Sequence, residues 1–99
     1  MTLLDLQRFK DVKSLLRKAM PVARSTLGDS NHLTLQMKLN FAITLYEDDD
    51  ATFDDLREAV TTLEETKRIA QRVLGGAHPT TNKIEVALQY AQSAAREAA

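Results

Sequence analysis

Side chains with catalytic or metal-binding chemistry are few in this sequence, and their spacing suits neither role. His32 and His78 are the only histidines among the 99 residues, and cysteine is absent. A metal site would have to recruit carboxylates, and nothing shows the helical two-histidine spacing of zinc enzymes. We therefore expect no metal. We expect both histidines to lie in turns, where they hydrogen-bond the loop and pack between repeating units of the fold.

Three further motifs match a functional site only in part. The acidic run at residues 47–50 lacks the alternating ligands, central glycine and closing glutamate of a calcium loop, so we expect Asp50 or Thr52 to cap the next helix. Gly75-Gly76 lacks the lysine of a phosphate loop and is expected to end a helix. No serine lies in the glycine-flanked context of a nucleophile elbow. The sequence thus predicts neither catalysis nor a cofactor.

Charge is segregated along the chain, although the net charge is only −1. Residues 1–28 hold six basic and two acidic side chains, a charge of +4. Residues 29–66 hold two basic and ten acidic side chains (−8), and residues 67–99 hold five basic and two acidic side chains (+3). We expect these blocks to complement one another across stacked helices. The acidic block and an aromatic content of 5% argue against nucleic-acid binding.

The first block carries a stripe of basic residues at helical spacing. Membrane-surface binding through this stripe is not expected, because the apolar side of the same segment is needed for packing. The chain shows no basic leader followed by an apolar run and no segment long enough to span a bilayer. We therefore expect a soluble protein, intracellular rather than secreted. The stripe consists of Lys10, Lys13, Arg17 and Arg24.

Apolar residues recur at intervals of three and four over four segments, which predicts an all-α fold of about four helices. The first begins before residue 9 and continues to Leu27, with a kink near residues 17–21 caused by Pro21. Gly28 supplies a left-handed terminus. The expected inward-facing residues of this segment are Leu6, Phe9, Val12, Leu15, Leu16, Ala19, Val22 and Ala23.

The other three helices are expected over about residues 33–46, 52–74 and 79–96, the last beginning at Pro79 or Thr80 and fraying beyond Arg96. Their expected inward-facing residues are Leu35, Leu39, Ala42, Ile43 and Tyr46 in the first of the three; Phe53, Leu56, Ala59, Val60, Leu63, Ile69, Ala70 and Val73 in the next; and Ile84, Ala87, Leu88, Ala91, Ala94 and Ala95 in the last.

A phrase that begins Leu27-Gly28 and contains His32 returns as Leu74-Gly75 with His78-Pro79, 47 residues later counted between the leucines. Repetition at this period predicts an array of helical hairpins. The halves match without a gap up to the second glycine. Beyond Gly75 we expect the second copy to be two residues shorter than the first. This alignment pairs Leu39, Ala42, Ile43 and Tyr46 with Ile84, Ala87, Leu88 and Ala91.

These residues resemble the tetratricopeptide repeat in its longer, kinesin-light-chain-like form. The first copy is carried by Leu27-Gly28 to His32 and by a Leu-Asn-x-x-x-x-Leu-Tyr helix at residues 39–46. The second copy is carried by Leu74-Gly75 with His78-Pro79-Thr80. The sequence departs from the family pattern at Leu33, where the family has proline, and at Glu85.

The resemblance implies antiparallel hairpins stacked as a short right-handed superhelix whose inner helices line a concave groove. On this reading residues 1–28 are the outer helix of a partial repeat, residues 29–75 a full repeat and residues 76–99 an inner helix. Asn40 would face the groove, where its amide can donate to and accept from a peptide backbone. The polar residues expected near the groove are Gln36, Lys38, Asn40, Lys83, Glu85 and Gln89.

We therefore expect a non-catalytic scaffold that binds a peptide or a partner protein through the groove. The alternative is a structural subunit of a larger complex that contacts its neighbours through its helical ends, and a third candidate is a regulatory domain detached from an enzyme. An array offset from its own repeat boundary leaves apolar residues of a terminal helix uncovered. We accordingly expect a homodimer or dependence on a larger assembly.

Overall fold

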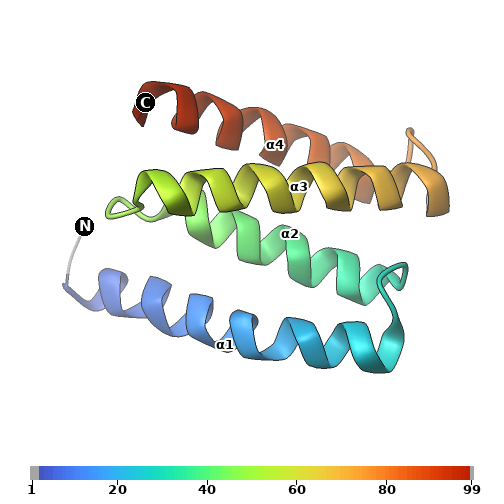
Figure 1. Cartoon of the computed structure of the whole chain (residues 1–99), viewed down its shortest axis with the longest axis horizontal. Helices are drawn as coiled ribbons and strands as arrows, with labels where there is room; N and C mark the ends of the chain where they lie inside the picture. The colour runs from blue at the N-terminus through green and yellow to red at the C-terminus, as the bar shows by residue number, and fades with distance from the viewer. Residues whose placement is uncertain (1–2, 99) are drawn as a thin grey trace.

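The structure, a computed structural model, describes residues 3–98, with side chains from residue 8 onward. It consists of α1 (Leu3–Leu27), α2 (His32–Glu47), α3 (Phe53–Val73) and α4 (Pro79–Ala98), and residues 3–98 contain no strand. None of the helices described is long and apolar enough to cross a membrane. Consecutive helices run antiparallel, so that α1 begins and α4 ends at the same end of the molecule (Figure 1).

The helix ends follow from local residue chemistry. Thr52 caps α3 because its hydroxyl accepts a hydrogen bond from Asp55 N (3.1 Å) while the Asp55 carboxylate accepts one from Thr52 N (3.2 Å). Of the two expected caps Thr52 is therefore confirmed and Asp50 is not. Helix α1 continues through Pro21 to Leu27, and α4 continues to Ala98, two residues beyond the point where fraying was expected.

Helix α2 lies at the centre of the stack, in contact with each of the other three helices. Helix α1 packs on α2, while α3 packs on both α2 and α4 (Figure 1). The result is the expected all-α stack of antiparallel hairpins, in which α1 packs on α2 and α3 packs on α4.

The core is built around α2 because this helix is covered on several sides. Leu35, Phe41 and Leu45 of α2 are at most 1% exposed and meet the fully buried Leu63 and Ile84 from α3 and α4. Phe41 and Leu45 were absent from the expected inward-facing set, which assumed one buried face. A helix with neighbours on several sides is apolar around most of its circumference.

The expected apolar face of α1 is wrong at three residues. Val12, Leu15 and Val22 are 44%, 67% and 64% exposed, whereas Ala23 is buried and Leu16 packs against the core. Helix α1 is the end of the stack, so only the side facing α2 is covered. The expected burial of Leu6 lies outside the described side chains.

Two residues of α3 also differ from expectation. Phe53 and Val73 are 43% and 45% exposed, although both were expected to face inward. They are the first and last residues of α3, in terminal turns at the edge of the core. Helical periodicity gives the direction of a side chain, but it does not show whether a neighbouring helix extends that far.

Truncation at the centre of α3 tests the core directly. We expect Leu63→Ala to lower the free energy of unfolding by about 3 kcal/mol, because it removes a fully buried side chain and leaves a cavity. Val73→Ala, on the same helix but 45% exposed, should change it by only about 0.5 kcal/mol. Urea denaturation followed by circular dichroism measures both. Equal effects would contradict the placement of Leu63 in the core.

Candidate functional site

The two turns that precede α2 and α4 have the same backbone geometry. Gly28 and Gly75 both adopt left-handed conformations, with φ of 87° and 91°. Asn31 N donates to Gly28 O and His78 N donates to Gly75 O, each at 3.3 Å. The left-handed terminus expected at Gly28 is confirmed, and the second turn repeats it 47 positions later in the sequence.

The same correspondence continues into the helices that follow. The side chain of Asn31 accepts from Leu33 N (2.9 Å), and at the equivalent place His78 Nδ1 accepts from Thr80 N (3.1 Å). The repeat therefore keeps its period of 47 past the turn, since His78 follows Asn31 and Thr80 follows Leu33 by that interval.

The expected shortening of the second copy by two residues is thus wrong. It rested on matching buried positions, for example Leu39 with Ile84. Burial is an unreliable guide here because α2 has helices on several sides and α4 lies at the end of the stack, so equivalent residues of the two helices have different surroundings.

The two histidines connect the turns to each other. The rings of His32 and His78 meet edge to face with centroids 5.8 Å apart, and His32 Nε2 is hydrogen-bonded to Thr80 Oγ1 at 2.9 Å. The expected packing of the two histidines against each other is confirmed, and His78 bonds at its own turn. His32 differs from the expectation, because it is the first residue of α2 and bonds to Thr80 of α4.

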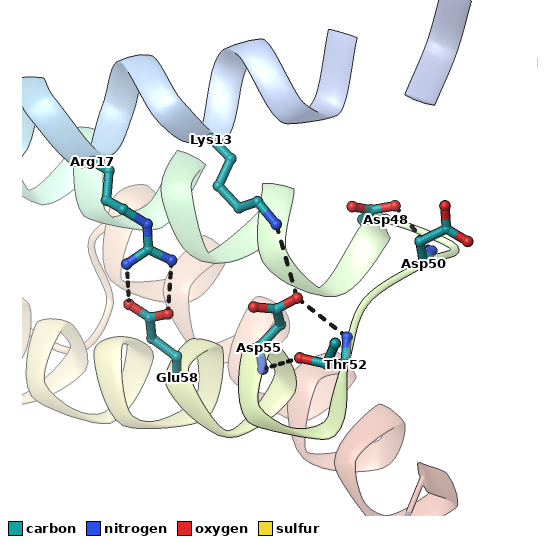
Figure 2. A network of polar contacts seen from close by, with 7 residues as sticks. All are labelled: Lys13, Arg17, Asp48, Asp50, Thr52, Asp55 and Glu58. Atoms are coloured by element: carbon teal, nitrogen blue, oxygen red, sulfur yellow. Dashed lines mark hydrogen bonds and ion pairs between the residues drawn. The ribbon is translucent and has the colours of Figure 1, made fainter. Parts of the chain in front are cut away.

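Metal-binding groups do not assemble elsewhere in the described part of the chain. Among the side chains of residues 8–98, no three from His, Cys, Asp or Glu cluster so as to hold a metal ion. The acidic run after α2 forms a turn in which the buried Asp48 carboxylate accepts a hydrogen bond from Asp50 N at 2.9 Å (Figure 2). This carboxylate therefore stabilises the turn itself.

A groove of about 610 Å³ runs between α2 and α4. Its lining includes four pairs of residues that lie 47 positions apart in the sequence, the period of the repeated turns. Tyr46, Thr80 and Asn82 complete the lining. The four pairs are Gln36 with Lys83, Leu39 with Val86, Asn40 with Ala87, and Ile43 with Tyr90.

The groove combines an apolar surface with uncharged hydrogen-bonding groups. Lys83 is the one cationic residue in its lining, and the lining includes no carboxylate. Partial burial, with smaller effects from the charges of Glu47 and Tyr90, raises the pKa of Tyr46 above its usual range. The Tyr46 phenol is therefore neutral at physiological pH and can both donate and accept a hydrogen bond.

Three of the six expected groove residues line the groove, namely Gln36, Asn40 and Lys83. The placement of the other three is wrong. Lys38 is buried (8% exposed) with its ammonium 3.3 Å from a carboxylate oxygen of Asp29, Glu85 pairs with Lys67 at 3.6 Å, and Gln89 is exposed outside the groove.

Lys38 was misplaced because the buried surface of α2 is wider than one apolar stripe. Lys38 lies one helical turn from the buried Thr34 and Ala42, on the side away from the groove. Sequence reasoning also missed Tyr90 and Val86, which the period of 47 would have found from Ile43 and Leu39 if no gap had been introduced.

Two residues of the basic stripe of α1, Lys13 and Arg17, pair with acidic side chains of α3 (Figure 2). Arg17 donates two hydrogen bonds to the Glu58 carboxylate, at 3.0 and 3.1 Å, and its guanidinium lies 5.1 Å from the centre of the Phe41 ring. Lys13 lies 3.8 Å from the Asp55 carboxylate. These pairs confirm the expected complementarity between the basic block at residues 1–28 and the acidic block at residues 29–66. The ion pair of the third block, Lys67–Glu85, lies within residues 67–99.

Comparison of the chain with protein-family models, with curated proteins and with solved structures finds no match. The features of the chain that bear on its function are its repeated turns, its groove and its distribution of charge and apolar surface.

The ion pair that holds Lys38 gives a prediction for stability against pH. Hydrogen bonding and charge attraction from Lys38, with a smaller contribution from Arg24, lower the pKa of Asp29. A lowered pKa in the folded state stabilises the fold above the unfolded value of about 3.9, and that contribution is lost as the pH falls through the folded pKa. Asp29→Asn should therefore reduce stability near neutral pH, by roughly 1 kcal/mol or less for so exposed a carboxylate.

Urea unfolding of both proteins at a series of pH values measures this difference. We expect the gap between wild type and Asp29→Asn to close as the pH falls below about 3.9. Asp49→Asn is the matched control, because this exposed carboxylate makes no ion pair with the residues described. A pH-independent gap for Asp29→Asn would contradict the role of the ion pair.

Proposed function

We propose that this chain is a non-catalytic scaffold of the tetratricopeptide type, which binds an extended peptide segment of a partner protein in the groove between α2 and α4. The observation that carries the proposal is the groove lining itself, in which four pairs of residues 47 apart form one surface. A repeat that places equivalent positions along one surface is typical of solenoid proteins that bind other proteins. The turn phrase and its 47-residue period support membership of the family.

The groove's chemistry favours peptide backbone together with apolar side chains. The amides of Gln36, Asn40 and Asn82 provide both donors and acceptors, which suits the alternating groups of an extended chain. The apolar surface around Ile43 and Val86 provides a place for side chains of the ligand.

Electrostatics narrows the class of peptide further. Lys83 contributes a positive charge to the groove with no carboxylate beside it in the lining. We therefore propose that the ligand is neutral or acidic rather than basic. The same lining lacks a nucleophile paired with a base, which supports binding without catalysis.

The two tyrosines allow binding to be measured without a label. The chain contains two tyrosines and no tryptophan, and both Tyr46 and Tyr90 line the groove. Peptides selected on the protein from a random display library should alter its tyrosine fluorescence when titrated. We expect the double variant Asn40→Ala, Lys83→Glu to bind the selected acidic or neutral peptides at least about tenfold more weakly, a loss of about 1.4 kcal/mol.

The matched control makes the same chemical changes outside the groove, as Gln92→Ala with Lys10→Glu. Both residues are exposed and neither lines the groove, so peptide affinity should not change. The helical circular dichroism of both double variants should equal that of wild type, because exposed positions move stability by only about 0.5 kcal/mol. Loss of affinity in the control with none in the groove variant would reject the groove and favour a structural subunit that uses its helical ends.

A further inference from the structure

A second surface, separate from the groove, lies at the α1 end of the stack. It is an open apolar hollow between α1 and α2, in which the exposed Leu15, Val22 and Leu33 surround Ala19 and Met37. Leu15, Val22 and Leu33 are 67%, 64% and 54% exposed. Lys18 also lines the hollow and makes no hydrogen bond or ion pair with the described residues.

The internal repeat shows how such a face is completed. The residues that follow Ala19, Leu33 and Met37 by 47 positions are Thr66, Thr80 and Ile84, and all three are buried. Their burial is possible because α2 packs on both α3 and α4. The positions of Ala19, Leu33 and Met37 thus belong to a surface that is covered in the second repeat and uncovered in the first, whereas Glu65, the equivalent of Lys18, is exposed as Lys18 is.

The opposite end of the stack does not match this face. The hollow between α3 and α4 is lined mostly by charged and amide side chains, and the Lys67–Glu85 ion pair (3.6 Å) joins the two helices beside it. Head-to-tail stacking of copies would press an apolar face against this charged one, which is unfavourable because the charges would lose water without pairing. The charged and amide residues in that hollow are Glu64, Glu65, Lys67, Arg68, Gln71 and Gln92.

The apolar face is instead complementary to itself. Asp11, Leu15, Lys18 and Val22 follow one another at intervals of four, three and four, which places them along one side of α1. If two α1 helices pack antiparallel about a two-fold axis at Leu15, Leu15 meets Leu15. Asp11 of each copy then lies opposite Lys18 of the other. The symmetry produces this opposite-charge pair twice.

We propose that the occupant of this face is a second copy of the chain, and that the two α1 helices pack antiparallel in a two-fold dimer centred on Leu15. The dimer leaves the α2–α4 groove of each copy open, because no residue of the apolar hollow lines the groove. Its existence is independent of peptide binding, so the two proposals can fail separately.

Charge exchange tests this geometry. Sedimentation of the whole chain over a range of concentrations should show a reversible monomer–dimer equilibrium for wild type. Lys18→Asp places Asp opposite Asp, and Asp11→Lys places Lys opposite Lys, so each variant alone should weaken the dimer at least about tenfold. An equal mixture of the two variants should recover the wild-type affinity, because every pair across the two-fold axis then has opposite charges.

Two further variants keep the result interpretable. Leu15→Asp should abolish the dimer with an unchanged helical spectrum, since this side chain is 67% exposed within one copy. Lys10→Asp makes the same change of charge on another side of α1 and should leave the dimer intact. A monomer at every concentration, an open-ended series of larger oligomers, or a mixture of Lys18→Asp and Asp11→Lys that stays monomeric would each overturn the proposal.

Discussion

The burial of α2 against three other helices is the constraint on which the rest of the structure depends. Leu35, Phe41 and Leu45 fill the centre of the molecule, and they do so from one short helix with neighbours on several sides. This requirement makes α2 apolar around most of its circumference and leaves one strip of it open. The open strip, beside α4, is the wall of the groove.

Most of the helical framework could be predicted from the sequence, because its signals are local. Gly28 and Gly75 end their helices in left-handed conformations, and Thr52 begins α3 with a capping box. The charge blocks likewise predicted complementary packing, which Arg17 and Glu58 illustrate across α1 and α3. Each of these features depends on a few neighbouring residues or on gross charge.

The contents of the site could be predicted only in part, because burial depends on neighbours that a sequence does not display. Lysine is usually found on the surface, yet Lys38 is buried beside Asp29 because α2 is covered on that side too. Leucine is usually found in the core, yet Leu15 is exposed because no described helix covers the outer side of α1. Because burial differs between equivalent positions, the alignment based on buried residues also missed the constant period of 47, which matches Ile43 with Tyr90.

Two faces of one small stack thus have different characters. The groove is apolar with amides, a neutral phenol and one cation, which suits a ligand that alternates polar backbone with side chains. The α1 end is an apolar surface with a symmetric arrangement of opposite charges, which suits a copy of itself. Arg17 joins α1 to the two helices beside it, because it contacts Phe41 of α2 and Glu58 of α3.

Amide chemical-shift mapping by nuclear magnetic resonance distinguishes binding in the α2–α4 groove from binding elsewhere, because it shows which residues a ligand contacts. The measurement is a titration of the isotope-labelled chain with an acidic peptide selected on it. The groove account predicts that the largest shifts fall on α2 and α4, around Asn40, Ile43, Val86 and Tyr90. Shifts centred on α1 and α3, with these four residues unmoved, would contradict it.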